Sequence, residues 1–138
     1  ATCTLVGSTM NGSVEVGANA RLNAVDMVVT GNLISDGAAE LNVSGASQVG
    51  GSVQIQRGAA ASIVGLRATG SLQIDAMAGP VTASGNQIGG NLQVLANLGG
   101  VTLTNNTSAG VMQCKDNLPA PTGSGNVASQ KQDQCVGL

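Results

Sequence analysis

The chain of 138 residues contains no Phe, Tyr, Trp or His, and only 9% of its residues are charged. Nucleic-acid binding is not expected, because no aromatic side chain can stack on a base and the five basic residues form no cluster. No apolar run approaches the length of a membrane span. Without histidine, the few acids and three cysteines make a poor ligand set, so we expect no metal and no other cofactor.

Glycine is abundant, with 21 residues, and part of it is regularly spaced. A glycine step recurs every 19 or 20 residues, at Gly12, Gly31, Gly51, Gly70, Gly90 and Gly110. Apolar and polar residues alternate after each step, most clearly in the segment 89–94, Gly-Gly-Asn-Leu-Gln-Val. A period of two is typical of a strand with one buried face. A second strand follows in each repeat, as at 101–104, and a single apolar residue then precedes the next glycine.

Repeats of this kind predict an all-β fold, a right-handed parallel β-solenoid with three short sides in each coil. The strands are too short for independent hairpins, and one coil buries too little apolar surface to be stable alone. The chain accommodates about six to seven coils of 19–21 residues in a single domain, 1–138. We expect a partial first coil at 1–11, regular coils at 12–114 and an irregular C-terminal coil or cap at 115–138.

Two of the three cysteines fall at similar places in the repeat. Gln134-Cys135 aligns with Gln113-Cys114, 21 residues earlier, which predicts the same position in neighbouring coils. Stacked coils bring such residues to a Cα separation of about 5 Å, so we expect a disulfide between Cys114 and Cys135. Cys3 is left over and is predicted to point inward as a buried free thiol, with an interchain bond as the alternative.

Glutamine recurs at the outward centre of the first strand of successive coils. The column contains Gln54, Gln73, Gln93 and Gln113, with Gln134 as its expected continuation. Side-chain amides stacked at the strand spacing are expected to hydrogen-bond along the axis and to stabilise the stack. A binding surface is the functional alternative.

Parallel β-helices include polysaccharide lyases and hydrolases, which need clustered carboxylates, a basic residue or a metal at a long cleft. The seven acidic residues of this chain fall on different sides and coils. Neither His nor Tyr is present to assist them. We therefore expect no enzymatic activity.

The segment 89–94 and the C-terminal pattern of Gln113-Cys114-Lys115-Asp116-Asn117, Pro119-Ala120-Pro121-Thr122-Gly123 and Gln134-Cys135 resemble a group of small secreted bacterial β-solenoid proteins. The resemblance spans nearly the whole chain and implies the solenoid fold and a secreted location, without implying an activity. In that group an early cysteine often pairs with one a coil later. Leu22 occupies that later position here, so this pairing is absent.

We expect the protein to be secreted, extracellular or at the bacterial cell surface. The chain begins with Ala1-Thr2-Cys3, which is typical of a mature chain after signal-peptide removal, and lysine is rare. The favoured function is a structural one, in which solenoid edges stack end to end into a fibre or surface layer and the partner is another copy of the chain. The expected assembly edges are Thr2, Cys3, Thr4 and Leu5 at one end, and Gln130, Gln132, Gln134 and Val136 at the other.

The alternative is a monomeric solenoid that binds an ice or carbohydrate surface. Thr102 and Thr104 provide two outward hydroxyls in one coil. The corresponding positions of the other coils are chemically mixed.

Overall fold

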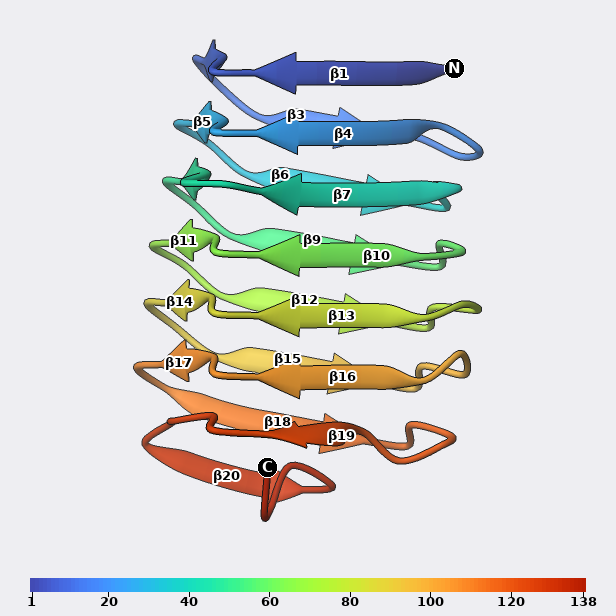
Figure 1. Ribbon diagram of the computed structural model, residues 1–138, viewed down its shortest axis with the longest axis vertical. Coiled ribbons are helices and arrows are strands. Elements are labelled where there is room, and N and C mark those ends of the chain that lie inside the picture. The colour runs from blue at the N-terminus through green and yellow to red at the C-terminus, as the bar shows by residue number, and fades with distance from the viewer.

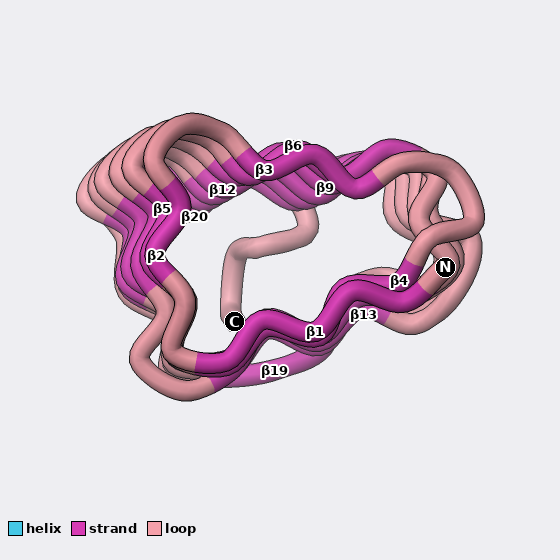
Figure 2. The backbone as a smooth tube through the Cα atoms, turned by 90° about the horizontal axis from the view of Figure 1, so that it is seen from above, coloured by secondary structure: helices cyan, strands magenta, loops and turns pink.

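Twenty short strands wind into a column of stacked coils in the computed structural model, which describes residues 1–138 (Figure 1). All strand pairs are parallel, and they form three sheets, so the predicted three-sided β-solenoid is confirmed. Seen from the N-terminal end, the chain turns clockwise as it recedes from the viewer, which makes the winding right-handed (Figure 2).

The chain passes through the three sheets in the order C, A, B in each coil, and only the coil that begins with β18 (Val111–Lys115) has no strand in sheet B. Sheet A contains β1 (Thr2–Val6), β4 (Arg21–Val25), β7 (Glu40–Ser44), β10 (Ala61–Val64), β13 (Val81–Ser84), β16 (Val101–Thr104) and β19 (Thr122–Ser124). Sheet B contains β2 (Thr9–Met10), β5 (Val28–Val29), β8 (Gln48–Val49), β11 (Arg67–Ala68), β14 (Gln87–Ile88) and β17 (Thr107–Ser108). Sheet C contains β3 (Val14–Val16), β6 (Leu33–Asp36), β9 (Val53–Gln56), β12 (Leu72–Asp75), β15 (Leu92–Leu95), β18 (Val111–Lys115) and β20 (Gln130–Asp133). The chain therefore enters on sheet A, as the partial first coil predicts.

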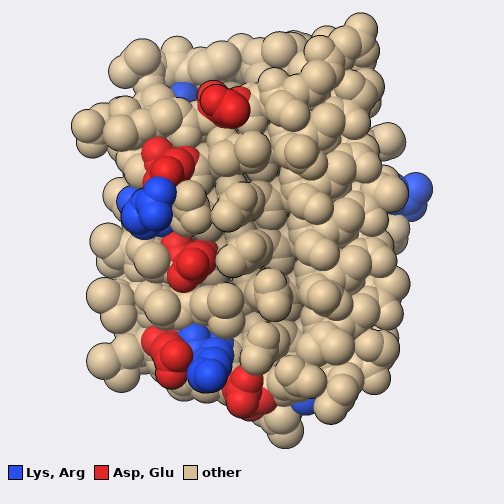
Figure 3. Space-filling model, turned by 180° about the vertical axis from the view of Figure 1, so that it is seen from behind, with Lys and Arg blue, Asp and Glu red and all other residues tan.

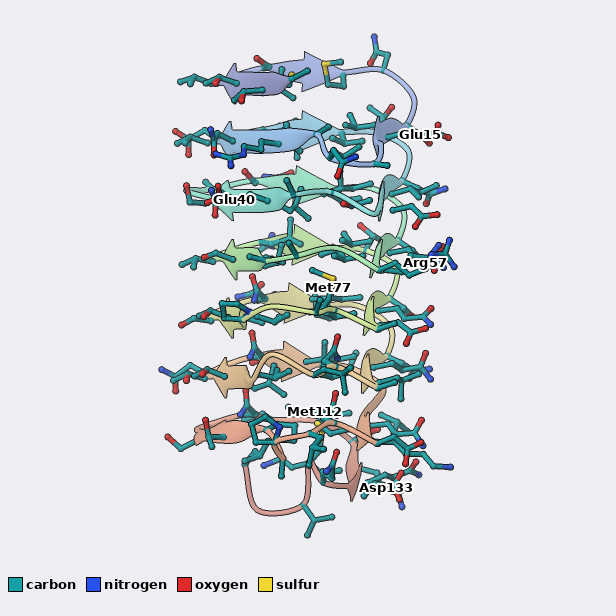
Figure 4. All side chains as sticks on the ribbon, turned by 90° about the vertical axis from the view of Figure 1, so that its right-hand side faces the viewer. Glu15, Glu40, Arg57, Met77, Met112 and Asp133 are labelled. Carbon is teal, nitrogen blue, oxygen red and sulfur yellow. A yellow bond between two sulfur atoms is a disulfide. The ribbon has the colours of Figure 1, made fainter.

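One apolar cluster of 29 buried residues runs along the axis between the sheets. Met77 and Met112 lie in this interior, whereas Glu40 projects from the sheet A side and Glu15 and Arg57 from the sheet C side (Figure 4). The alternation of buried and exposed residues along the strands follows the apolar and polar alternation of the sequence.

The glycine step marks the corner between sheets B and C, where successive coils approach closely. A Cβ atom on Gly70 would lie 2.9 Å from the carbonyl oxygen of Gly51 in the preceding coil, so a larger residue does not fit there. A small polar residue follows the first five of these glycines and also has a structural role. Its side-chain oxygen accepts a hydrogen bond from a backbone N–H of the next coil, as when Ser52 Oγ accepts from the amide of Ser71 at 3.1 Å.

Two columns of buried asparagine connect the later coils at the other two corners. Asn86, Asn106 and Asn126 form one column between sheets A and B, and Asn97 and Asn117 form the other between sheets C and A. Each side-chain oxygen accepts from the preceding coil, and each side-chain nitrogen donates to a backbone carbonyl, such as Asn97 Nδ2 to the Ile74 oxygen at 3.1 Å. These amides satisfy buried backbone groups where the chain turns between strands.

The second regular coil keeps the register of its neighbours. Ser35 is buried and pairs with Ile55, while Ile34 points outward opposite Gln54. Its pattern, with Ile34 outward and Ser35 inward, is therefore a difference of residue type within an unchanged register.

The predicted alignment of the last coil is wrong by two residues. Gln113 pairs with Gln132 and Cys114 pairs with Asp133, so Gln134 and Cys135 lie beyond the end of β20. The strand ends because Asp133 adopts a left-handed conformation with φ of 55°, and the chain then turns back under the interior (Figure 2). The disulfide Cys114–Cys135 is nevertheless present, with a Cα separation of 5.0 Å.

Candidate functional surfaces

Charged side chains gather in a band along one side of the back face, and most of that face is uncharged (Figure 3). Two ion pairs are present, Arg57 with Asp36 and Arg21 with Glu40. Hydrogen bonding to the Arg57 guanidinium holds the pKa of Asp36 below its usual range. No group of three or more His, Cys, Asp or Glu side chains lies close enough to hold a metal ion. No helix of the structure is suited to crossing a membrane.

The outward glutamines of sheet C lie in one column, as their spacing predicts. The register pairs Gln54 with Gln73, Gln73 with Gln93 and Gln93 with Gln113. Their amides do not hydrogen-bond to one another along the axis. Gln54 Nε2 instead donates to Gln56 Oε1 in the same strand at 3.3 Å, and Gln113 Nε2 donates to an Asp133 oxygen at 3.0 Å.

Gln134 has a different role from the one that the sequence predicts. It leaves the outward column, which Gln132 continues, and its side chain reaches the buried asparagine column. Gln134 Oε1 accepts from the backbone N–H of Asn117 at 2.9 Å, and Gln134 Nε2 donates to the Asn117 oxygen at 2.9 Å. The residue therefore ends the column at the corner between sheets C and A.

The N-terminal end of the solenoid exposes three edge strands, β1, β2 and β3, one in each sheet. Inward positions here are only partly covered: Leu5, Met10 and Val14 are half-buried. Their partners in the next coil, Ala24, Val29 and Leu33, are at most 1% exposed. A hollow of about 150 Å³ opens at this end, and Ala1, Cys3, Val14, Val16, Ala20 and Leu22 are among the residues that line it.

Cys3 occupies the predicted inward position but is not buried. It pairs with Leu22, which confirms that the residue one coil later cannot form a disulfide with it. Its thiol is free and exposed, on β1 at the edge of sheet A. The prediction of a buried thiol is therefore wrong.

The C-terminal end differs from the N-terminal end because the segment after β20, residues 134–138, crosses its interior (Figures 1 and 2). Cys135 is fully buried, Leu138 packs against the core, and Lys131 Nζ donates to the Leu138 oxygen at 2.6 Å. Among the residues predicted for this edge, Gln130 and Gln132 belong to β20, whereas Gln134 and Val136 lie in the covering segment. Val136 is 67% exposed.

The outer face of sheet A carries a block of hydroxyls in its last coils. The register aligns Thr82, Thr102 and Thr122 in one column and Ser84, Thr104 and Ser124 in the next. The sequence pattern did not place Thr122 and Ser124 in these columns, because the repeat is irregular between Lys115 and Pro121. The structure thus gives three successive coils with two outward hydroxyls each.

No family model matches the chain, and no curated protein or solved structure is significantly similar to it.

Proposed function

We propose that the protein is a secreted structural subunit that assembles end to end, with the first coil of one copy stacking on the last coil of another. The observation that carries this proposal is the open N-terminal end, where three edge strands surround an apolar hollow. Unpaired strand edges next to half-buried apolar side chains favour the addition of further strands. The disulfide is consistent with an oxidising, extracellular location.

The two ends are complementary in strand order. Each coil runs through sheets C, A and B, so the strand that would follow β20 belongs to sheet A, and β1 is a sheet A strand. In the proposed contact β1 pairs with β19 of the next copy, and β3 pairs with β20. The protruding Val136 of that copy then enters the hollow lined by Val14 and Leu22.

This contact joins different surfaces of the two copies. It is therefore heterologous and leaves one free end of each kind, so that growth continues into a filament. A filament of stacked solenoids would form the fibre or surface layer in which we place the protein.

The peptide groups at the free edge of β1 offer a sharp test. Arg21 donates to the Ala1 oxygen and Gly7 donates to the Val25 oxygen, both at 2.9 Å. Because successive peptide groups in a strand point to opposite edges, the N–H of Thr4 faces away from β4. Thr4→Pro therefore removes a donor of the free edge and no hydrogen bond within the molecule.

We expect filaments of the parent chain in electron micrographs and a loss of filaments with Thr4→Pro. Thr4→Ala is the matched control, because it shortens the side chain and keeps the N–H. Thermal unfolding of both variants would verify that each is folded. Uniform short particles from the parent at concentrations well above micromolar, or equal assembly by the proline and alanine variants, would refute the proposal.

A second candidate is the binding of an ice surface by the hydroxyl block of sheet A. The observation that favours it is the regular array of Thr82, Ser84, Thr102, Thr104, Thr122 and Ser124. Strand stacking spaces these hydroxyls by about 4.8 Å along the axis. Inhibition of ice recrystallisation by the parent, and its loss when Thr102 and Thr104 are replaced by Lys, would support this function. An inactive parent would exclude it.

A further inference from the structure

A shallow groove runs along the outer face of sheet B. Two hollows with volumes of about 310 and 360 Å³ follow one another there, beside β5, β8, β11 and β14. A third hollow of about 280 Å³ lies across the Gln48–Arg67–Gln87 column, at the corner with sheet A. Arg67 lines all three hollows. The groove is thus centred on a single guanidinium.

Arg67 differs from the other two arginines in having no carboxylate partner. Arg21 and Arg57 each form an ion pair, whereas the one side-chain hydrogen bond of Arg67 runs from Nη2 to Gln87 Oε1 at 3.0 Å. This bond to a neutral amide does not neutralise the charge of the guanidinium. The remaining N–H donors are free to bind an anion, and a guanidinium pairs with a carboxylate through two parallel hydrogen bonds.

Neutral hydrogen-bonding groups surround the cation. Gln48 and Gln87 flank it in the neighbouring coils, and Thr69 lines two of the hollows. Thr30 and Thr107 lie farther along the groove, toward its two ends. All five side chains are exposed. Amides and hydroxyls repeated at the coil spacing suit a chain that itself carries many hydroxyls.

We propose that this groove binds an extended acidic polysaccharide, with Arg67 pairing with a carboxylate of the chain and the flanking amides and hydroxyls bonding to its hydroxyl groups. A peptide fits less well for two reasons. The strands of sheet B around Arg67 are paired on both sides and offer no free edge, and the groove has no large apolar pocket for an anchoring side chain. The inference is independent of end-to-end assembly, because the groove lies on the side of the solenoid.

The experiment measures binding of polygalacturonate to the full chain by isothermal titration calorimetry. Arg67→Gln is expected to weaken binding about tenfold or more, since hydrogen bonds to charged groups are the strong ones. Arg21→Gln is the matched control: it removes the same charge from sheet A and is expected to leave the affinity unchanged within about twofold. Equal thermal midpoints of the parent and the Arg67→Gln variant would show that the fold is intact.

Three results would overturn the inference. The first is no binding of polygalacturonate by the parent. The second is equal weakening by the two arginine variants, which would indicate a general charge effect. The third is equally tight binding of polyglutamate or neutral dextran, since either would remove the requirement for an acidic polysaccharide.

Discussion

Replacing Asn106 by alanine is expected to destabilise the protein strongly. Asn106 is the middle member of its buried column and is 1% exposed. Its Oδ1 accepts from the backbone N–H of Asn86 at 3.2 Å and from Asn86 Nδ2 at 2.8 Å. Its Nδ2 donates to the Ala83 oxygen at 2.9 Å and to Asn126 Oδ1 at 2.9 Å.

The size of this destabilisation follows from the buried polar groups that lose a hydrogen-bond partner. Asn106→Ala removes all four of these bonds and leaves groups of Asn86, Ala83 and Asn126 buried without them. A buried unsatisfied group costs about 1–3 kcal/mol, and shared partners prevent a simple sum. We therefore expect the free energy of unfolding to fall by about 3–5 kcal/mol, at the upper end of single substitutions.

Urea unfolding followed by far-ultraviolet circular dichroism measures this loss. Asn23→Ala is the control, because Asn23 lies on the outer face of sheet A and its one side-chain hydrogen bond is with Asn42. The freed Asn42 amide can bind water, so we expect a change within about 0.5 kcal/mol. If Asn106→Ala costs no more than Asn23→Ala, the buried column does not stabilise the stack and the reasoning fails.

Two further predictions concern the disulfide and the Asp36–Arg57 pair. Cys135→Ser removes the crosslink between two residues with a sequence separation of 21 and should lower the free energy of unfolding by about 3 kcal/mol. Hydrogen exchange should become faster only within residues 115–138. An unchanged free energy of unfolding would contradict this prediction. Asp36→Asn should lower the thermal midpoint slightly at neutral pH. The pKa of Asp36 is lower in the folded state than in the unfolded state, so the Asp36 carboxylate stabilises the fold at pH values above the ordinary carboxyl range. This stabilisation is lost as the pH falls through the lowered pKa. The thermal midpoints of the parent and the variant should therefore converge at acidic pH. A gap that persists there would contradict the assignment.

The coil, its three sides and the partial first coil are readable from the sequence, because they depend on a period of two within strands and a glycine step between coils. Gly70 shows why glycine is needed at this step, since the preceding coil leaves no room for a side chain. The asparagine columns are harder to infer. Asn86, Asn106 and Asn126 recur every 20 residues, yet asparagine is equally common in exposed turns, and the sequence alone does not distinguish the two uses.

Register at the end of the chain depends on a local turn that the repeat does not specify. Left-handed residues also follow the sheet C strands of earlier coils, as at Ala96 and Asp116, but Asp133 takes this conformation two residues earlier in the register, which ends β20 before Gln134. The alternation of Gln-Lys-Gln-Asp-Gln offers two equally good alignments, and the cysteine pair favours the one that the structure does not adopt. Arg67 was also missed, because its importance depends on having no acid beside it, which is a property of the folded surface.

End-to-end stacking is tested most directly by a crosslink between the free thiol of Cys3 and the covering segment of the next copy. Cys3 lines the hollow at the N-terminal end, and Val136 is exposed at the other end. With Val136→Cys, mild oxidation should produce a ladder of dimers, trimers and longer species on a non-reducing gel, and adding Cys3→Ser should abolish it. A monomer band alone, or dimers that form equally without Val136→Cys, would contradict the account.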